Sequence, residues 1–243
     1  MKLLIIRHAD PDYSIDSLTE TGWKEAAALS EKLKTFDIKN IYVSPLGRAK
    51  DTASLTLKKL GKDATVCEWL QEFPGNIIRP DYKDGRIVPW DWLPEDIDKN
   101  RDLLDINHWF ENETYREGNI HEGYMHVAEE LDKLLAQHGY VREGTYYRVE
   151  KANNDTIAFF CHFGLECVLL SHLVNIAPSA LWQGFCAAPS SVTTIYTEER
   201  RKGIASFRIA EFGSTEHLYV KGEKPSFSAR FCECYDNEDE RHD

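Results

Sequence analysis

The sequence KLLIIRH at residues 2–8 sets an uninterrupted apolar run directly against an arginine and a histidine. A short run that is apolar throughout, without alternation, is typical of a strand covered on both faces, as in a parallel sheet with helices on each side. The run is too short, and too soon interrupted by charge, for the apolar core of a secretory signal peptide. We therefore expect a central buried strand that ends at Arg7 and His8.

Further segments of this kind alternate with helical patterns along the chain. Short strands are predicted at 40–43, 64–67, 156–161, 191–197 and 204–212, and helices at about 22–34, 44–60, 121–138 and 164–174. Ser44 and Pro45 match the N-cap and the first position of a helix. Strands that alternate with helices predict an α/β fold, with a mostly parallel sheet and helices on both faces. The length of 243 residues suits a single domain of this type.

Between residues 73 and 119 this alternation breaks down. The segment is rich in proline and glycine at its start and contains Trp90, Trp92 and Trp109. We interpret 73–119 as an inserted cap, partly irregular, that shapes access to one end of the sheet. Tryptophans in such a segment are nevertheless more often core residues than a platform for a ligand. The polar and acidic residues 222–243 are expected to form a flexible tail.

The bulk composition limits the partners of the protein. The formal net charge is −12 and 42% of the residues are hydrophobic, as in a folded globule without general affinity for nucleic acid or an anionic membrane. No apolar run approaches the roughly 20 residues that span a bilayer. The six cysteines are too scattered for a disulfide framework. We expect a cytoplasmic protein in which any anionic ligand is held by a local cluster of positive groups.

Three strand ends carry side chains that indicate chemistry. The first strand ends at Arg7 and His8, a later strand ends at His162, and Arg48 lies in the first turn of the helix after the second strand. A cation is disfavoured in a first helical turn, which indicates a functional reason for Arg48. Ligands of parallel sheets bind beyond the carboxyl ends of the strands. Two guanidinium groups and two imidazoles there suit a tetrahedral oxyanion such as a phosphoryl group.

The chemistry of phosphoryl transfer gives these residues different tasks. The non-bridging oxygens carry the charge, so fixed positive donors at Arg7, Arg48 and His162 would clamp them. A neutral imidazole at His8 can attack phosphorus and form a phosphohistidine that water later hydrolyses. The leaving oxygen then needs a proton, which requires a carboxylic acid on the far side of the phosphoryl group.

These residues lie in motifs that resemble the histidine phosphatase superfamily, in its phosphoglycerate mutase-like branch. The similar segments include LIIRHA (4–9), LTETG (18–22), SPLGRAKDTA (44–53), LQE (70–72), HEG (121–123) and CHFG (161–164). The resemblance implies His8 as the phosphorylated nucleophile and Glu72 as the proton donor. It also implies a phosphate pocket of Arg7, Arg48 and His162, with no metal ion and no cofactor.

The same resemblance assigns three more residues to the binding of the phosphate. Phe163 stands where other branches of the superfamily have an aspartate, Ser14 stands near the place of an asparagine in many members, and Glu122 lies in a segment before a helix. Glu122 is equally compatible with a capping role at the start of that helix. Glu68, four residues before Glu72, competes with it for the role of acid.

The sequence therefore predicts a phosphatase that hydrolyses a small phosphomonoester through a phosphohistidine on His8. A phosphomutase with the same nucleophile is an alternative, and so is a non-catalytic module that binds a phosphorylated ligand. The complete set of nucleophile, clamp and acid speaks against the last alternative, because binding alone needs no proton donor. The physiological substrate and the oligomeric state are left open.

Overall fold

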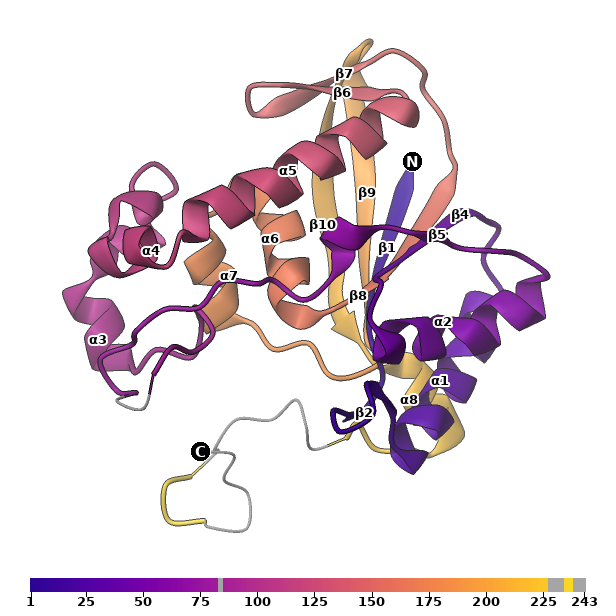
Figure 1. Cartoon of the computed structure of the whole chain (residues 1–243). Helices are drawn as coiled ribbons and strands as arrows, with labels where there is room; N and C mark the ends of the chain where they lie inside the picture. Colours follow the sequence, from indigo (N-terminus) through magenta and orange to yellow (C-terminus); the bar gives the residue numbers. More distant parts are fainter. Residues whose placement is uncertain (83–84, 227–233, 238–243) are drawn as a thin grey trace.

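The computed structural model describes residues 1–82, 85–226 and 234–237, and its centre is an eight-stranded mixed sheet (Figure 1). The strand order is β5-β4-β8-β1-β9-β10-β7-β6. The parallel half consists of β1 (Lys2–Arg7), β8 (Thr156–Cys161), β4 (Ile38–Val43) and β5 (Thr65–Val66). The antiparallel half consists of β9 (Val192–Arg201), β10 (Ile204–Ser214), β7 (Tyr146–Val149) and β6 (Tyr140–Glu143). The α/β class is confirmed, and the parallel strands are those around β1.

The apolar run of β1 explains why helices cover both faces of the sheet. Successive side chains of a strand point to opposite faces, so Leu3 and Ile5 belong to one buried cluster while Leu4 and Ile6 belong to another. The helices that cover the sheet are α1 (Glu20–Leu33), α2 (Gly47–Leu60), α5 (Ile120–Gln137) and α6 (Phe163–Val174). Helices α1 and α2 pack on the Leu4 face, and α5 and α6 pack on the Leu3 face. Each aliphatic side chain buried in this way contributes about 1.5–3 kcal/mol.

The predicted start of α2 is wrong by two residues. The N-cap of α2 is Leu46, which makes no side-chain capping bond, and the first helical residue is Gly47. The Ser44 hydroxyl does accept a hydrogen bond from the N–H of Leu46 (3.2 Å), but its oxygen also lies 2.8 Å from Nε2 of His162. The side chain that the sequence assigned to a helix cap therefore joins two strand ends instead.

The described residues of 73–119, which exclude 83 and 84, include short elements beside α5 and α7 (Pro178–Gly184) (Figure 1). These elements are α3 (Pro94–Lys99), the 3₁₀ turns η2 (Arg101–Leu104) and η3 (Trp109–Glu111), and α4 (Glu113–Glu117). Trp90, Trp92 and Trp109 are all buried in the core cluster on the α5 and α6 face. The tryptophans are thus core residues, while a role of this segment as a cap over the site stays a prediction.

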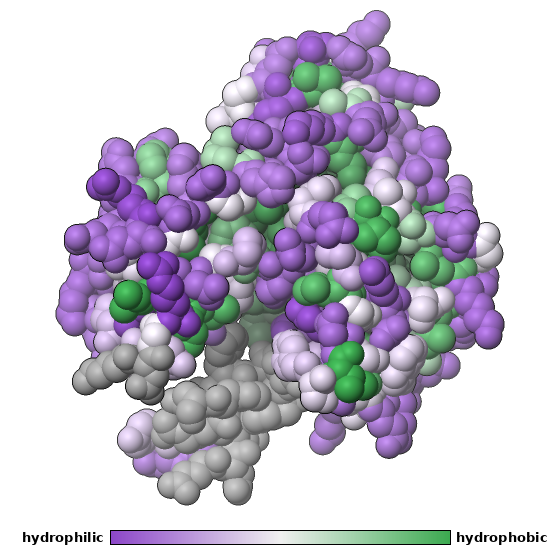
Figure 2. All heavy atoms as spheres, viewed as in Figure 1, coloured by the Kyte–Doolittle hydropathy of each residue, from purple (hydrophilic) through white to green (hydrophobic). Residues whose placement is uncertain are grey.

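The end of the described chain returns to α1. Helix α8 (Glu216–Lys221) packs against α1, and the backbone N–H of Ser226 donates to Oε1 of the buried Glu25 (3.1 Å). Of the predicted tail, residues 227–233 and 238–243 lie outside the described residues. Within the part that the structure describes, no helix has the length and apolar character needed to cross a bilayer. The face shown in Figure 2 is mostly hydrophilic, with small separate apolar patches.

Candidate active site

The ends of β1 and β8 bring the two predicted imidazoles together. The strands run parallel with Arg7 opposite Cys161, and the N–H of His8 donates to the carbonyl oxygen of Cys161 (2.9 Å). His162 follows Cys161, and its ring centroid lies 5.1 Å from that of His8. The pairing register of two adjacent strands therefore builds the centre of the site.

The surroundings of His8 determine the tautomer and the charge of its ring. It is 2% exposed, and its Nδ1 lies 2.8 Å from the carbonyl oxygen of Ala9. A carbonyl oxygen can only accept, so Nδ1 carries the hydrogen and Nε2 keeps its lone pair. Burial first, and then the charges of Arg7 and Arg48, lower the pKa of His8 to about 3, although the bond to Ala9 acts in the opposite direction. His8 is consequently a neutral imidazole near pH 7.

The second imidazole, His162, is held as a hydrogen-bond donor. It is fully buried at the N-cap of α6, and Nε2 faces the Ser44 hydroxyl. The hydroxyl accepts the N–H of Leu46 and keeps one proton, so it can donate to Nε2 of His162; in that tautomer Nδ1 carries the ring hydrogen. Burial, His8 and the two arginines hold the pKa of His162 well below its usual range. The contact of Ser44 with His162 is one that the sequence did not suggest.

The two arginines approach the imidazoles from different elements. Arg7, at the end of β1, donates through Nη1 to the carbonyl oxygen of Ala187, and its guanidinium lies 5.8 Å from the centroid of the Phe163 ring. Arg48, in the first turn of α2, donates through Nη1 to Oδ1 of Asp16 (2.6 Å). In both side chains the Nε atom takes no part in these hydrogen bonds and can donate to another partner.

Three nitrogen atoms of this site are buried without a hydrogen-bond partner among the described residues: Nε of Arg7, Nε of Arg48 and Nδ1 of His162. The charges of both arginines act on the pKa of both histidines, so the four side chains form one electrostatic group. A buried donor without a partner destabilises a fold by about 1–3 kcal/mol. Three such donors at one edge of the sheet indicate a binding site for an anion with several acceptor oxygens.

The predicted acid, Glu72, lies at the same edge, after the 3₁₀ turn η1 (Glu68–Leu70). Its Oε1 accepts the backbone N–H groups of Phe73 (2.8 Å) and Leu165 (3.0 Å). Burial raises the pKa of Glu72, while the Phe73 N–H, the charge of Arg7 and the Leu165 N–H oppose the rise. The competing Glu68 is exposed. The geometry therefore places Glu72, and not Glu68, in a buried environment that favours the protonated form of a carboxyl group.

The approach of Glu72 to the start of α6 depends on Gly164. A Cβ at this position would lie 2.8 Å from Oε1 of Glu72 and 2.3 Å from the Trp90 ring. Any side chain here would have to displace one of the two. The missing side chain of Gly164 therefore lets the acid and the 73–119 segment meet the first turn of α6.

A second buried carboxyl group, Glu166, lies one helical turn after His162. It is 1% exposed, and the Thr193 hydroxyl lies beside its carboxyl group as a hydrogen-bond donor. Burial raises the pKa of Glu166 to about 7; the Thr193 hydroxyl and the charge of Arg7 act against this shift, and Glu72 adds to it. Sequence reasoning missed Glu166, although it is the only acidic residue in the apolar helix FGLECVLLSHLV.

The remaining predicted residues differ in their surroundings. Phe163 is buried against Arg7, as stated above. Ser14 is exposed, and its hydroxyl and N–H both donate to Oδ1 of Asp12. Glu122 is exposed in the first turn of α5, and no contact among the described residues connects it to the pocket. The structure thus brings Phe163 to the site, while phosphate-binding roles for Ser14 and Glu122 have no contact that supports them.

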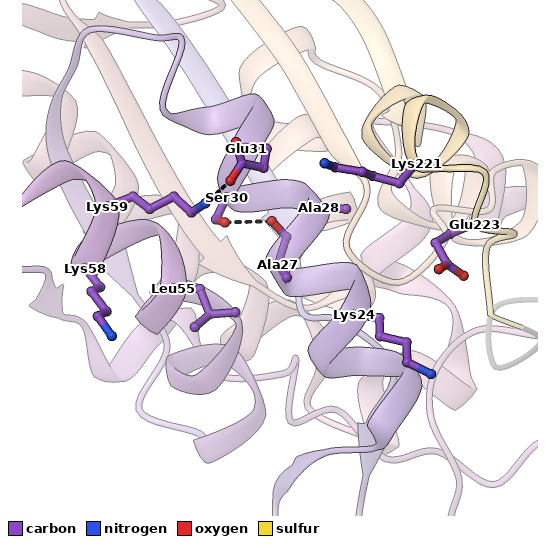
Figure 3. Close-up of a pocket in the computed structure, with 10 residues that line it drawn as sticks. All are labelled: Lys24, Ala27, Ala28, Ser30, Glu31, Leu55, Lys58, Lys59, Lys221 and Glu223. Atoms are coloured by element: carbon purple, nitrogen blue, oxygen red, sulfur yellow. Dashed lines mark hydrogen bonds and ion pairs between the residues drawn. The ribbon is translucent and has the colours of Figure 1, made fainter.

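A separate groove of about 710 Å³ lies between α1, α2 and α8 (Figure 3). It is lined by four lysines and by Glu31 and Glu223, and Lys59 pairs with Glu31 across it. None of the side chains described above lines this groove. Among the described residues, no three His, Cys, Asp or Glu side chains are grouped so that they could hold a metal ion.

A neutral buried imidazole, flanked by two guanidinium groups, a second imidazole and a buried carboxyl group, defines the class of an α/β protein with a site for a phosphoryl-type anion. The model of the histidine phosphatase superfamily (branch 1) matches residues 3–210 of the chain. The chain therefore belongs to the histidine phosphatase superfamily.

Individual relatives are more distant. A 2,3-bisphosphoglycerate-dependent phosphoglycerate mutase of Thermoplasma acidophilum is 34% identical over 79 residues, which cover 28% of this chain and 40% of the mutase. The chain thus matches about two fifths of the length of this curated relative.

Solved structures share the fold over most of the chain. A phosphoserine phosphatase variant from Entamoeba histolytica, in complex with phosphoserine, has a TM-score of 0.57 at 20% identity and covers 89% of this chain and 98% of that chain. A mycobacterial glucosyl-3-phosphoglycerate phosphatase with bound VO3 has a TM-score of 0.56 at 21% identity, covering 88% and 99% of the two chains. At these identities the likeness establishes the fold.

Proposed function

We propose that this chain is a phosphomonoesterase that transfers a phosphoryl group from a small phosphorylated substrate to His8 and then to water. The observation that carries the proposal is the group of unpaired donors on Arg7, Arg48 and His162 around the neutral His8. These donors match the non-bridging oxygens of a phosphoryl group, where charge is spread in the transition state.

In the first half-reaction, the lone pair on Nε2 of His8 forms a bond to phosphorus while the bond from phosphorus to the ester oxygen breaks. The imidazole becomes positively charged, and the Ala9 carbonyl oxygen stabilises that charge through its bond to the Nδ1 hydrogen. Glu72 gives its proton to the leaving oxygen, and its raised pKa keeps that proton available at higher pH than for an ordinary glutamate.

In the second half-reaction, water attacks the phosphorus of the phosphohistidine. Glu72, now a carboxylate, takes a proton from that water, and the bond between phosphorus and Nε2 breaks. Inorganic phosphate leaves, His8 is again neutral, and Glu72 is again protonated. The cycle balances in protons and charge, and its two steps use one acid in both directions.

A phosphomutase is the second candidate, because the chain is similar to a phosphoglycerate mutase over 79 residues. A mutase would use the same His8 and return the phosphoryl group to the substrate. The two activities differ in their product, since only the phosphatase releases inorganic phosphate continuously from a single substrate.

The proposal is tested by incubating the protein with a panel of phosphorylated metabolites and following the release of inorganic phosphate. The panel includes phosphoserine and 3-phosphoglycerate, which are bound by proteins of the same fold. We expect steady release from at least one phosphomonoester, and an acid-labile phosphoenzyme in a rapid quench. Isomerised product without phosphate release would favour the mutase, and the absence of both products and of any phosphoenzyme would refute the enzymatic proposal.

We also propose that the reaction needs no metal ion, because Arg7, Arg48 and His162 already provide the positive charge and donors that a phosphoryl group requires. Activity is expected to survive exhaustive chelation. Loss of activity on chelation, restored by one divalent ion, would contradict this.

A further inference from the structure

The carboxylate of Asp16 makes two strong contacts at the start of α2. Asp16 ends the loop between the short strands β2 (Pro11–Asp12) and β3 (Ser17–Leu18), which lies beside the start of α2 (Figure 1). Its Oδ2 accepts the backbone N–H of Gly47 (2.6 Å), and its Oδ1 accepts from Nη1 of Arg48 (2.6 Å). Asp16 therefore supplies from another segment the capping group that Leu46, the N-cap of α2, lacks.

These contacts fix one end of the guanidinium of Arg48 and leave another free. Nη1 is bound to Asp16, and the ring of Tyr13 lies 5.3 Å from the guanidinium. Nε of Arg48 is buried and has no hydrogen-bond partner among the residues that the structure describes. The guanidinium is planar, so holding Nη1 and one face sets the direction in which the Nε–H points.

The backbone is shaped to permit this approach. Asp16 has a φ of 48°, a conformation that a non-glycine residue adopts only at a free-energy cost. A Cβ on Gly47 would lie 2.0 Å from the Asp16 carbonyl oxygen. The close contact thus needs an unusual backbone on one side and a glycine on the other. Such a pair of requirements is not expected of an incidental surface ion pair, which contributes little to stability.

We propose that Asp16 is a positioning residue for the phosphoryl clamp, which holds the guanidinium of Arg48 so that its Nε–H faces the phosphoryl oxygens bound beside His8. This inference rests on the proposed function. The N–H of Gly47 and the guanidinium of Arg48 hold the pKa of Asp16 below its usual range, against the effect of burial, so Asp16 stays ionised throughout the neutral range.

The opposite arrangement would make Asp16 a competitor of the substrate. An aspartate on a phosphate-binding arginine could occupy the place of a phosphoryl oxygen, and substrate would then have to displace it. The free Nε of Arg48 argues for the positioning role, because the clamp retains a donor while Asp16 is in place. The two roles predict opposite effects of removing the carboxylate.

The test measures binding of orthovanadate, a phosphoryl mimic, by calorimetry, independently of turnover. D16A is expected to weaken binding roughly 10-fold to 100-fold, the range for loss of order around a charge-assisted hydrogen bond. D16N, whose amide oxygen can still accept from Gly47 or Arg48, is expected to lose less. The matched control is D51N, because Asp51 anchors the same loop to α2 through Ser17 (2.6 Å) without contacting Arg48.

A double-mutant cycle with R48A separates positioning from a general effect on the fold. If Asp16 acts through Arg48, D16A will weaken vanadate binding no further in the R48A background. Tighter binding by D16A, or equal losses with and without Arg48, would overturn the inference. Failure of the wild-type protein to bind vanadate or to release phosphate would instead refute the proposed function, so the two failures are distinct. Thermal unfolding of D16A and D16N verifies that the measured variants are folded.

Discussion

The anion site and the 73–119 segment differ in whether their buried donor groups have hydrogen-bond partners. In the 73–119 segment, Nε1 of Trp92 and the hydroxyl of Tyr115 both donate to the carbonyl oxygen of Pro89. At the strand ends, Nε of Arg7 and Nε of Arg48 are buried with no such partner among the described residues. The first arrangement favours folding, and the second opposes it unless a ligand supplies the missing acceptors. The comparison therefore distinguishes a region whose buried polar groups are paired from the region of the proposed active site.

The largest effect should come from His8. His8→Ala removes the nucleophile, so we expect the rate of phosphate release to fall by roughly 10⁴-fold or more, as when other covalent nucleophiles are removed. The unfolding temperature should change little, because the His8 ring lies among the unpaired donors of the site and not in the hydrophobic core. His138→Ala is the matched control, since His138 is half-buried against Tyr42 outside the site. A His8→Ala protein with full activity would remove the basis of the comparison.

A somewhat smaller effect is expected from the acid. Glu72→Gln should slow phosphoryl transfer from alkyl phosphates by on the order of 10²–10⁴-fold, the usual range for general acid catalysis. A nitrophenyl phosphate should lose far less, because its phenolate leaves without a proton. Single-turnover measurements are required, since slow hydrolysis of the phosphoenzyme can hide the difference at steady state.

Two carboxylates serve as controls for this experiment. Glu68→Gln alters an exposed residue close to Glu72 in sequence and should leave both substrates unaffected. Glu122→Gln tests the other predicted residue of the site. Equal losses for alkyl and aryl substrates in Glu72→Gln would mean that Glu72 orients the phosphoryl group. A selective loss in Glu122→Gln would transfer the acid role to that residue.

The third prediction concerns stability in the anion site. The pKa of Glu166 is about 7 in the folded protein and near 4.5 when solvated, so the folded state binds more protons between these values. Stability conferred by the protonated Glu166 is therefore present below about pH 4.5 and is lost as pH rises to about 7. The total change is about 3 kcal/mol by the linkage relation, an order-of-magnitude figure.

Denaturant unfolding of Glu166→Gln and wild type at a series of pH values measures this term as the difference between the two proteins. We expect the wild type to lose stability relative to the variant as pH rises from 4.5 to 7. The difference also cancels two other contributions: Glu25, whose pKa burial raises to about 7, and His8, whose lowered pKa makes stability rise with pH. A pH-independent difference would show that the pKa of Glu166 is the same in the folded and unfolded states.

The smallest effect is expected where the two regions touch. The ring of Trp90 lies against Gly164 beside Glu72, whereas Trp92 packs edge-on against Tyr115. Trp90→Phe should therefore change the relative rates of two substrates by roughly 10-fold, the effect of about one pocket contact. Trp92→Phe is the matched control and should preserve the ratio. Unchanged ratios in both variants would make the whole 73–119 segment structural.

The sequence predicted which strand-end residues lie together better than it predicted the segment beside them, for a physical reason. Arg7, His8 and His162 are fixed by where two strands end, and strand ends can be read from short apolar runs. The irregular 73–119 segment has no period to read, so its short helices and turns depend on tertiary packing around buried tryptophans.

The residues that the sequence analysis missed act across long distances in the chain. Asp16 reaches α2 only because Gly47 has no side chain, and Ser44 leaves its expected cap to contact His162. No local pattern contains either contact. Glu166 is different, because a single acid within an apolar helix was visible in the sequence as an anomaly and was not interpreted.

The burial of His8 also bears on the lifetime of the proposed phosphohistidine. Because the His8 residue is only 2% exposed, we expect water to reach a phosphoryl group on its ring mainly from the side that the alcohol product leaves. Dissociation of the first product and entry of water then become consecutive events along one route. If the alcohol product dissociates slowly, it can take the phosphoryl group back, which regenerates or isomerises the substrate. If it dissociates quickly, water takes the phosphoryl group and hydrolysis is complete. The partition between phosphatase and mutase chemistry would then be decided by the residence time of the alcohol product beside Trp90 and Glu72.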